Sequence, residues 1–336
     1  MSLNTQAIVL IAKSYPSRNT PQIHMKPIPI LLACILAAAS ARADWTVKDD
    51  ANTELPGRKV DITQDGVLRA RFIYGEGQIK PYLRVYGEEG DGLNEWDEKQ
   101  QFPHHRGIYI GWNKIESDLG SFDLWHMTKG AAMAVKKLEK LEGGKDSATL
   151  VATIEWDGGK PDAGGSKLLL TETRTLTISR PAAKAVQVDA KFELNPARDL
   201  TLGGDLQHAG IHFRASKTVQ DRKAETAYVW EPDLEGKGGK VVSKDLKWAR
   251  LTFPIGTRWY HATELNAPTN PVDELSWRDY GRFGFFFTKA LKMDEKLAVK
   301  YRFVTELAAD VTAKPTDEQR AGFRKQAQAL YDAFAK

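Results

Sequence analysis

The chain of 336 residues is 42% hydrophobic and 27% charged, with 27 glycines and 15 prolines. This composition is ordinary for a folded globular protein and excludes the collagen-like, coiled-coil and intrinsically disordered classes. Four of the 48 basic residues and none of the 44 acidic residues precede Asp44, so the net charge of +4 belongs to the N-terminus. The remainder is neutral and lacks the positive field that attracts nucleic acid, so we expect no nucleic-acid partner.

The first 43 residues have the pattern of a leader. Lys26 follows Met25, an apolar run extends over 27–39, and Ser40-Ala41-Arg42-Ala43 resembles an A-x-A cleavage site. We therefore expect a signal peptide whose true start is Met25, and a periplasmic or secreted mature chain from Asp44. The mature chain has no apolar run long enough for a bilayer, so no membrane span is expected after removal of the signal.

Apolar and polar residues alternate with a period of two along much of the mature chain, which is typical of strands with one solvated face. Lys59–Thr63 and Val67–Tyr74 flank Gln64-Asp65-Gly66, a sequence that predicts a hairpin turn. The same criteria predict further strands at Tyr82–Tyr86, Gly107–Trp112, Leu150–Trp156, Leu168–Ser179, Val186–Leu194, Ile211–Ala215, Arg282–Thr288 and Leu297–Leu307.

Many short strands separated by glycine turns predict an all-β fold, a large antiparallel β-sandwich. We expect residues 44–336 to form a single domain, and the alternative is a division near residue 135, because Val135–Leu141 is weakly patterned. A C-terminal helix is predicted over 316–335. Thr316 and Gln319 have the spacing of a capping box at its start.

Six histidines lie in the mature chain, and four of them form two pairs. His104 and His105 are consecutive, and His208 and His212 are four residues apart, which places both on one face if the segment is a strand. Imidazoles that converge on a sheet are suited to general acid–base catalysis, so these four are the candidate catalytic residues. The alternative is that each histidine bonds a backbone carbonyl or packs against a tryptophan.

The same histidines also suggest a divalent metal site, with His105, His208 and His212 as the ligands. Neither an H-E-x-x-H motif nor a cysteine ligand supports this hypothesis, because the only cysteine, Cys34, lies in the leader. The cofactor is accordingly expected to be either none or a divalent metal.

Glu172 and Arg174 occupy strand positions where the alternation predicts core residues. They either form a buried pair or line a cleft, because a buried charge is costly unless it is paired. Trp112, Trp125 and Trp277 stand next to polar residues, and aromatic faces beside charged groups are suited to sugar rings. Large aromatic side chains are also common in sandwich cores.

Several sequence blocks resemble one bacterial family of exported proteins. These blocks are Lys80-Pro81-Tyr82, Phe102-Pro103-His104-His105-Arg106-Gly107 with Trp112, Phe122-Asp123-Leu124-Trp125, Asn266 to Pro271, and Trp277-Arg278-Asp279-Tyr280-Gly281. They resemble the proteins labelled PmoA-like, a family of unknown function of the DUF6807 type, over about Lys80 to Phe287. The resemblance implies a large β-sandwich similar to the galactose mutarotase-like supersandwich, in which a histidine and a carboxylate open and close sugar rings.

We therefore expect an exported carbohydrate-active protein that performs acid–base chemistry on a sugar, by epimerisation, elimination or hydrolysis. The partner would be a small or oligomeric carbohydrate. The expected substrate-binding residues are Arg106, Trp112, Trp125, Glu172, Arg174, Trp277 and Arg278. Two alternatives remain at this point, a metal-dependent enzyme that uses the histidines as ligands and a sandwich that binds a glycan without catalysis.

Overall fold

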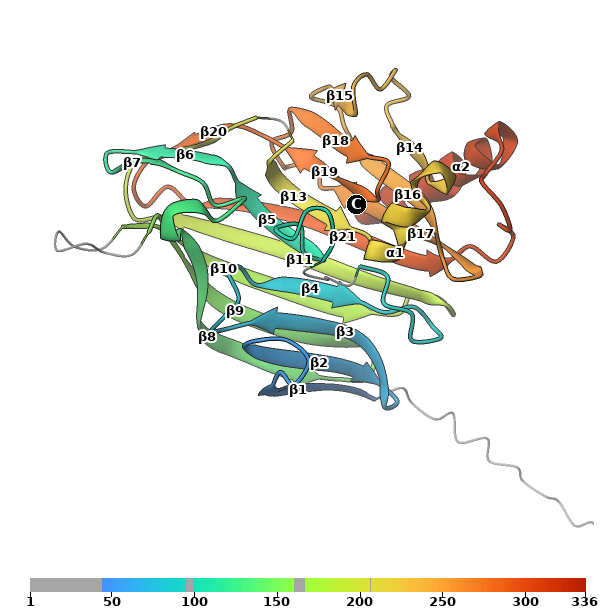
Figure 1. The fold of residues 1–336 in the computed structure, drawn as a ribbon, viewed down its shortest axis with the longest axis horizontal. Helices are drawn as coiled ribbons and strands as arrows, with labels where there is room; N and C mark the ends of the chain where they lie inside the picture. Colours follow the sequence, from blue (N-terminus) through green and yellow to red (C-terminus); the bar gives the residue numbers. More distant parts are fainter. Residues whose placement is uncertain (1–43, 95–98, 160–166, 206) are drawn as a thin grey trace, which may run out of the picture. The chain divides into compact units, whose positions relative to one another are not determined.

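The computed structural model describes residues 44–94, 99–159, 167–205 and 207–336, and the expected signal peptide lies outside these ranges. The described residues belong to one compact unit, Arg42–Lys336. Antiparallel strands build two large sheets and a small one, so the predicted all-β antiparallel sandwich is confirmed (Figure 1). No helix within these ranges is long and apolar enough to cross a membrane.

The first large sheet, within the described ranges, has nine strands in the order β1-β2-β3-β4-β5-β13-β19-β18-β15. They span Trp45–Ala51 (β1), Arg58–Gln64 (β2), Val67–Tyr74 (β3), Tyr82–Val85 (β4), Ile108–Trp112 (β5), Ala209–Arg214 (β13), Arg282–Phe286 (β19), Glu274–Arg278 (β18) and Lys240–Val242 (β15). Because β13 pairs with both β5 and β19, the sheet joins three segments that are far apart in the sequence.

The second large sheet, counted over the same ranges, has eight strands in the order β14-β16-β17-β21-β11-β10-β9-β8. They span Ala227–Glu231 (β14), Trp248–Ile255 (β16), Arg258–Asn266 (β17), Leu297–Leu307 (β21), Ala185–Pro196 (β11), Leu168–Ser179 (β10), Ser147–Asp157 (β9) and Ala132–Gly143 (β8). The weakly patterned Val135–Leu141 lies within β8, where two register shifts interrupt the alternation. The sequence there is therefore that of a bulged strand in the sandwich.

A smaller sheet, the long helix α2 and three short helical segments complete the described part of the fold. The sheet has the order β20-β12-β6-β7, with strands at Lys289–Leu291 (β20), Leu200–Gly203 (β12), Lys114–Ser117 (β6) and Gly120–Phe122 (β7). The helices are α1 at Lys217–Asp221, α2 at Asp317–Phe334 and 3-10 turns at Thr128–Gly130 and Lys223–Glu225.

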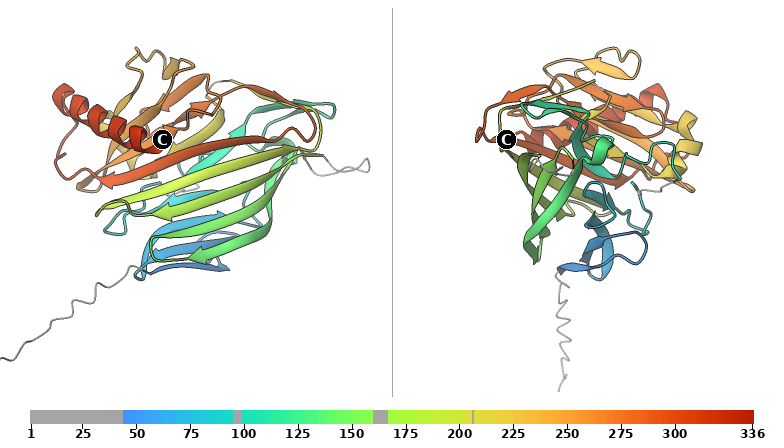
Figure 2. Two further views of the ribbon diagram at one scale, coloured as in Figure 1. Left: turned by 180° about the vertical axis from the view of Figure 1, so that it is seen from behind. Right: turned by 60° about the vertical axis from the view of Figure 1, so that its left-hand side comes forward.

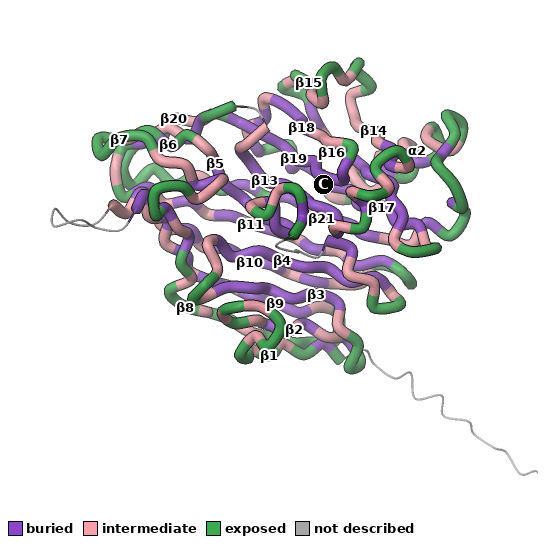
Figure 3. The backbone as a smooth tube through the Cα atoms, viewed as in Figure 1, coloured by how far each residue is buried: buried purple, intermediate pink, exposed green. Residues whose placement is uncertain are grey.

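The hydrophobic core lies between the two large sheets, which form layers in Figure 2. Phe72, Ile110 and Phe213 project into it from the nine-stranded sheet, and Ile154 and Phe192 come from the other sheet. Burial therefore follows the central strands, as the colouring in Figure 3 shows. Removal of this apolar surface from water is the main force that holds the sheets together.

Helix α2 covers the outer face of the eight-stranded sheet at β14, β16 and β17. Its buried residues Phe323 and Ala327 pack with Trp248, Trp259 and Leu265. The predicted capping box is confirmed, because the Thr316 hydroxyl accepts from the Gln319 amide and the Gln319 side chain accepts from the Thr316 amide. These reciprocal bonds satisfy donors at the helix start that have no partner within the helix.

The other face of the nine-stranded sheet carries polar residues near its centre. Tyr109 lies opposite His212, His212 lies opposite Gly284, and Gly284 lies opposite Ser276. Residues that are directly opposite in neighbouring strands project to the same face. This row therefore begins a polar surface that crosses β5, β13, β19 and β18 on the side away from the core.

Candidate functional site

Five histidines from three segments converge on this polar surface. The ring of His104 lies 4.3 Å from that of His105 and 4.5 Å from that of His126, and His126 lies 4.8 Å from His208, measured between centroids. Trp125 contacts the ring of His212 at 4.8 Å. The structure thus brings the four predicted histidines together and adds His126; we call these five the histidine cluster.

The positions of His208 and His212 differ from the prediction. Strand β13 begins at Ala209, so His208 lies in the turn before it and the two residues do not share a strand face. Both rings nevertheless contact the indole of Trp125, whose centroid lies 6.2 Å from that of His208 and 4.8 Å from that of His212. The expected convergence therefore arises from a turn and a strand, and not from strand periodicity.

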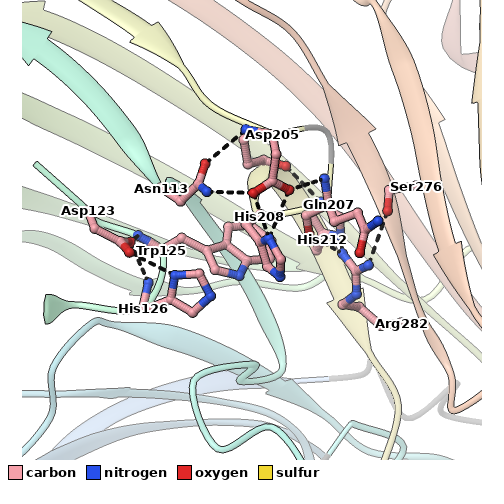
Figure 4. Close-up of polar contacts among 11 residues, drawn as sticks. Asn113, Asp123, Trp125, His126, Asp205, Gln207, His208, His212, Ser276 and Arg282 are labelled. Carbon is pink, nitrogen blue, oxygen red and sulfur yellow. Dashed lines mark hydrogen bonds and ion pairs between the residues drawn. The ribbon is translucent and has the colours of Figure 1, made fainter. Parts of the chain in front are cut away.

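Hydrogen bonds fix the state of His212 at the bottom of the cluster. Its Nε2 lies 2.8 Å from the Ala209 carbonyl oxygen, and its Nδ1 lies 3.1 Å from an Nη of Arg282 (Figure 4). A carbonyl can only accept and a guanidinium can only donate, so Nε2 carries the proton and Nδ1 is the acceptor. Burial and the charge of Arg282 lower the pKa of His212 well below its usual value, which keeps the ring neutral.

Two carboxylate–histidine pairs lie at the exposed side of the cluster. The Nδ1 of His126 is 2.8 Å from Asp123 Oδ2, and the Nδ1 of His208 is 2.8 Å from Asp205 Oδ1. Burial raises the pKa of both aspartates, but bonds from the histidines and from backbone amides outweigh it and lower the pKa, so the carboxylates are ionised and each Nδ1 donates. Each Nε2 is then left as the atom that can take or give a proton.

Exposure divides the cluster into a floor and a rim. His105 and His212 are 2% and 0% exposed, whereas the His126 and His208 side chains are 29% and 32% exposed. Burial lowers the pKa of His105 well below 6.5 and that of His104 to about 3, so both are neutral near pH 7. Burial also lowers the pKa of His208, although Asp205 opposes this. The rim histidines are thus the ones that a substrate in solvent can reach.

Lys80 is fully buried beneath the cluster. Its ammonium group donates to the Trp125 carbonyl and lies 4.9 Å from the centroid of the Tyr109 ring. Burial, together with the charges of Arg106 and Arg174, lowers the pKa of Lys80 well below its usual value. This lysine fixes the Trp125 backbone, and with it the segment that carries His126.

Of the predicted substrate-binding residues, Trp125 lies against the cluster and Arg278 lies on the same face of the sheet, whereas Trp277 projects to the core face. Trp277 lies opposite Phe283, and Phe283 lies opposite the core residue Phe213. Trp125 is fully buried and contacts His105, His208 and His212, so it supports the cluster from below. Trp277 and Arg278 lie at the end of β18, both partly exposed. Trp277 stacks on Trp230 at 5.9 Å, and an Nη of Arg278 donates to the Gly239 carbonyl at 3.0 Å.

The remaining predicted substrate-binding residues are occupied by structural contacts. Glu172 and Arg174, 0% and 2% exposed, form a two-point ion pair that Trp156 and the Pro81 carbonyl complete. Of the two alternatives for this pair, the structure shows the buried one. Trp112 is buried in the core and donates to the Phe287 carbonyl at 3.0 Å. Arg106 bonds the Pro103 carbonyl and Gln78, which holds the turn that precedes β5.

The metal hypothesis gains no support from this geometry. Across the described part of the chain, no group of three or more histidine, cysteine, aspartate or glutamate residues is arranged to hold a metal ion. Of the three ligands considered, His212 has both ring nitrogens engaged, whereas the bond of His208 Nδ1 to Asp205 leaves its Nε2 free. His105, His208 and His212 therefore do not form a ligand set.

A hollow of about 350 Å³ adjoins the two carboxylate–histidine pairs. It is lined by Asp123 and by Asn113, whose amide donates to Asp205 at 2.7 Å. Lys129 and Lys167 also line it. The volume is at the lower end of the range for small-molecule sites.

Sequence reasoning missed several residues of the site, although a signal was present for some of them. Asp123 precedes His126 and Asp205 precedes His208 by three residues, so a D-x-x-H spacing occurs twice. Repetition of this spacing could have identified both pairs. No local pattern marks Arg282, because its contact with His212 depends on the pairing of β13 with β19.

Solved structures show distant similarity to carbohydrate-active enzymes. A galactose mutarotase related enzyme from Lactobacillus acidophilus aligns with a TM-score of 0.38 and 7% identity, over 81% of this chain and 100% of that chain. A Glycoside Hydrolase Family 97 enzyme from Pseudoalteromonas sp. strain K8 aligns with a TM-score of 0.32, at 11% identity in complex with panose and 12% with acarbose. The alignments cover 78% of this chain and 34% of the hydrolase, so the chain spans about a third of that enzyme.

No curated protein matches the sequence. The model of the family of unknown function DUF6807 matches residues 59–317, which is most of the chain and includes every residue of the histidine cluster. The family predicted from the sequence blocks is therefore confirmed, and the chain belongs to the family of unknown function DUF6807.

Proposed function

We propose that this protein is a carbohydrate-active enzyme that moves protons on a sugar, with His126 and His208 as its acid–base pair. The observation that carries the proposal is the adjacency of two carboxylate-bound imidazoles at the rim of one cluster, with their rings 4.8 Å apart. A carboxylate on Nδ1 orients an imidazole and stabilises its protonated form. Both rings are therefore prepared for proton transfer through Nε2.

The short distance between the two rings favours a state with one shared proton. The charge on either imidazolium disfavours protonation of the other, because like charges at this separation repel. In this state the neutral histidine removes a proton from a substrate hydroxyl or carbon. The imidazolium then gives its proton to the ring oxygen or to the departing oxygen, and a return step restores the pair.

The surroundings of the pair favour a polyhydroxylated substrate. Asn113, Asp123 and the lysines of the adjoining hollow offer donors and acceptors for hydroxyl groups. Groups that donate and accept directional hydrogen bonds are suited to the hydroxyl groups of a sugar.

The proposal is tested by turnover of free sugars and glycosides, with anomer exchange followed by NMR and elimination or hydrolysis followed by product analysis. We expect His126→Gln and His208→Gln each to reduce kcat by about 10²- to 10⁴-fold, the usual contribution of a general acid or base. Asp205→Asn should also reduce kcat, because a neutral amide stabilises the imidazolium less.

The pH profile and a remote histidine provide the controls. Activity should follow a bell-shaped curve, since the pair must hold one proton. His261→Gln should retain activity, because His261 packs on Phe323 beneath α2 and bonds Thr252. Unchanged turnover in correctly folded His126→Gln and His208→Gln would exclude this pair from the chemistry.

A further inference from the structure

Three arginines form a row across the polar face of the nine-stranded sheet. Arg214 on β13 lies directly opposite Arg282 on β19, and Arg282 lies directly opposite Arg278 on β18. Residues paired in this way have Cβ atoms roughly 5 Å apart, and like charges at directly opposite positions destabilise a sheet. A row of three such cations therefore needs a compensating interaction.

The bonds of the arginine row, over the described residues, go to neutral acceptors and to no carboxylate. Arg214 donates to the Tyr280 carbonyl and to the Gln220 side chain. Arg282 donates to the carbonyl of Gln207, to His212 and to Ser276, and Arg278 donates to backbone carbonyls. Arg214 and Arg282 are each 1% exposed, so water compensates their charges little.

Several buried polar atoms beside the row have no hydrogen-bond partner among the described residues. They are the Nε of Arg214, the Nε of Arg282, the Tyr109 hydroxyl and both ring nitrogens of His105. The ring centroids of His105 and Tyr109 lie 6.0 Å apart. The charges of Arg282 and Arg214 act on both groups, and each disfavours a proton on His105 and favours loss of the proton from Tyr109. Such groups are normally satisfied in folded proteins, and donors without acceptors call for an acceptor-rich ligand.

One acidic group on the same face of the sheet, Glu274, offsets the charge of the arginine row only in part. Glu274 lies on β18, the strand that also carries Arg278, and its carboxyl oxygens have no partner among the described residues. Burial raises the pKa of Glu274 to about 7, so about half of it is neutral at that pH. The negative charge of Glu274 interacts favourably with Arg278, which lies at the exposed end of the row. The buried guanidinium groups of Arg214 and Arg282 gain little from it.

We propose that the arginine row binds the carboxylate of an acidic sugar, a uronate, next to the histidine cluster. Arginine is suited to this task because its planar fork pairs with both oxygens of a carboxylate. Arg282 joins the two regions, since it donates to the His212 ring while it belongs to the row. This inference rests on the proposed function, for which it names the substrate class.

The test measures equilibrium binding, independent of turnover, by calorimetry with D-glucuronate, D-galacturonate and D-mannuronate against glucose, galactose and mannose. We expect the native protein to prefer at least one uronate over its neutral parent by about 10- to 100-fold, the ratio that a charge-assisted hydrogen bond provides. Arg282→Gln should remove this preference, and Arg282→Lys should restore part of it. Arg302→Gln is the matched control, because Arg302 pairs with Asp189 on the other sheet.

The native protein also provides a measurement that does not depend on the folding of the variants. A uronate should raise its melting temperature more than the parent hexose does, and inorganic sulfate should compete. Equal binding of uronates and hexoses, a preference that survives in folded Arg282→Gln, or binding of sulfate without any uronate would overturn the inference.

The two proposals fail in different ways. If uronates bind through the arginines but turnover does not depend on His126 and His208, the proposed function is wrong and the arginine site stands. If neutral sugars are turned over with that dependence and uronates are not preferred, the arginine site is wrong and the acid–base pair stands.

Discussion

The ion pair of Glu172 and Arg174 shows how the sandwich accommodates charge in its interior. Three donors converge on the Glu172 carboxylate, two from Arg174 and one from the Trp156 indole at 2.7 Å. The remaining guanidinium nitrogen donates to the Pro81 carbonyl at 3.0 Å. The alternation on β10 predicted two charges at core positions, but only the tertiary structure distinguishes this closed pair from a cleft.

Glu172→Gln should destabilise the fold strongly. The substitution leaves the Arg174 guanidinium buried without a counter-charge, which costs about 3–5 kcal/mol. Glu193→Gln is the control, because Glu193 pairs with Lys191 at the surface, where their side chains are 42% and 38% exposed respectively. A pair this exposed contributes about 1 kcal/mol or less to stability. Urea unfolding of both variants measures the difference, and similar losses would show that the buried pair is not structural.

At the scale of elements, the period-two pattern predicted strands best where one face is solvated. Strands β10 and β21 have the predicted bounds, Leu168–Ser179 and Leu297–Leu307. Strand β16, Trp248–Ile255, was not predicted, and seven of its eight residues are buried. Because α2 covers one face and the core covers the other, its polar–apolar alternation is lost.

Strand β19 makes a close approach to β13 that the site depends on. A Cβ at Gly284 would lie 2.0 Å from the Ile211 carbonyl oxygen and 2.7 Å from the His212 Cα. Because these are backbone atoms, Gly284→Ala should separate the strands, cost about 1–3 kcal/mol and weaken uronate binding through Arg282.

Gly322→Ala is the matched control for this element. A Cβ there meets no atom within 4 Å, so the change in α2 should stabilise the protein by about 0.5–1 kcal/mol. Urea unfolding and uronate calorimetry on both variants test the pair of expectations. Normal stability and binding in Gly284→Ala would show that the close approach is not required.

At the scale of the whole molecule, the sandwich fold was predictable and the composition of the site only in part. The histidines were recognisable because they occur as pairs in a chain with few of them. The arginine row was not, since Arg214 and Arg282 are brought together by pairing across 68 positions of sequence that no local pattern encodes. Sites that cross several strands depend on sheet order, which periodicity does not specify.

Burial of histidines also makes the whole fold sensitive to acid. Burial lowers the pKa of His104 and His261 to about 3 and those of His105 and His212 well below 6.5. Below pH 6.5 these histidines are therefore protonated in the unfolded chain but remain neutral in the folded chain. The free energy of unfolding consequently falls as the pH falls.

Each of these histidines contributes up to about 1.4 kcal/mol per pH unit between its unfolded and folded pKa values. We expect urea midpoints to be steady from pH 8 to 7 and to fall steeply between pH 6 and 4. His261→Gln should reduce that slope by about the contribution of one histidine, because it removes one buried imidazole away from the cluster. A stability that stays constant from pH 7 to 4 would mean that these imidazoles take up protons in the folded state, and the neutral floor inferred for the histidine cluster would then be wrong.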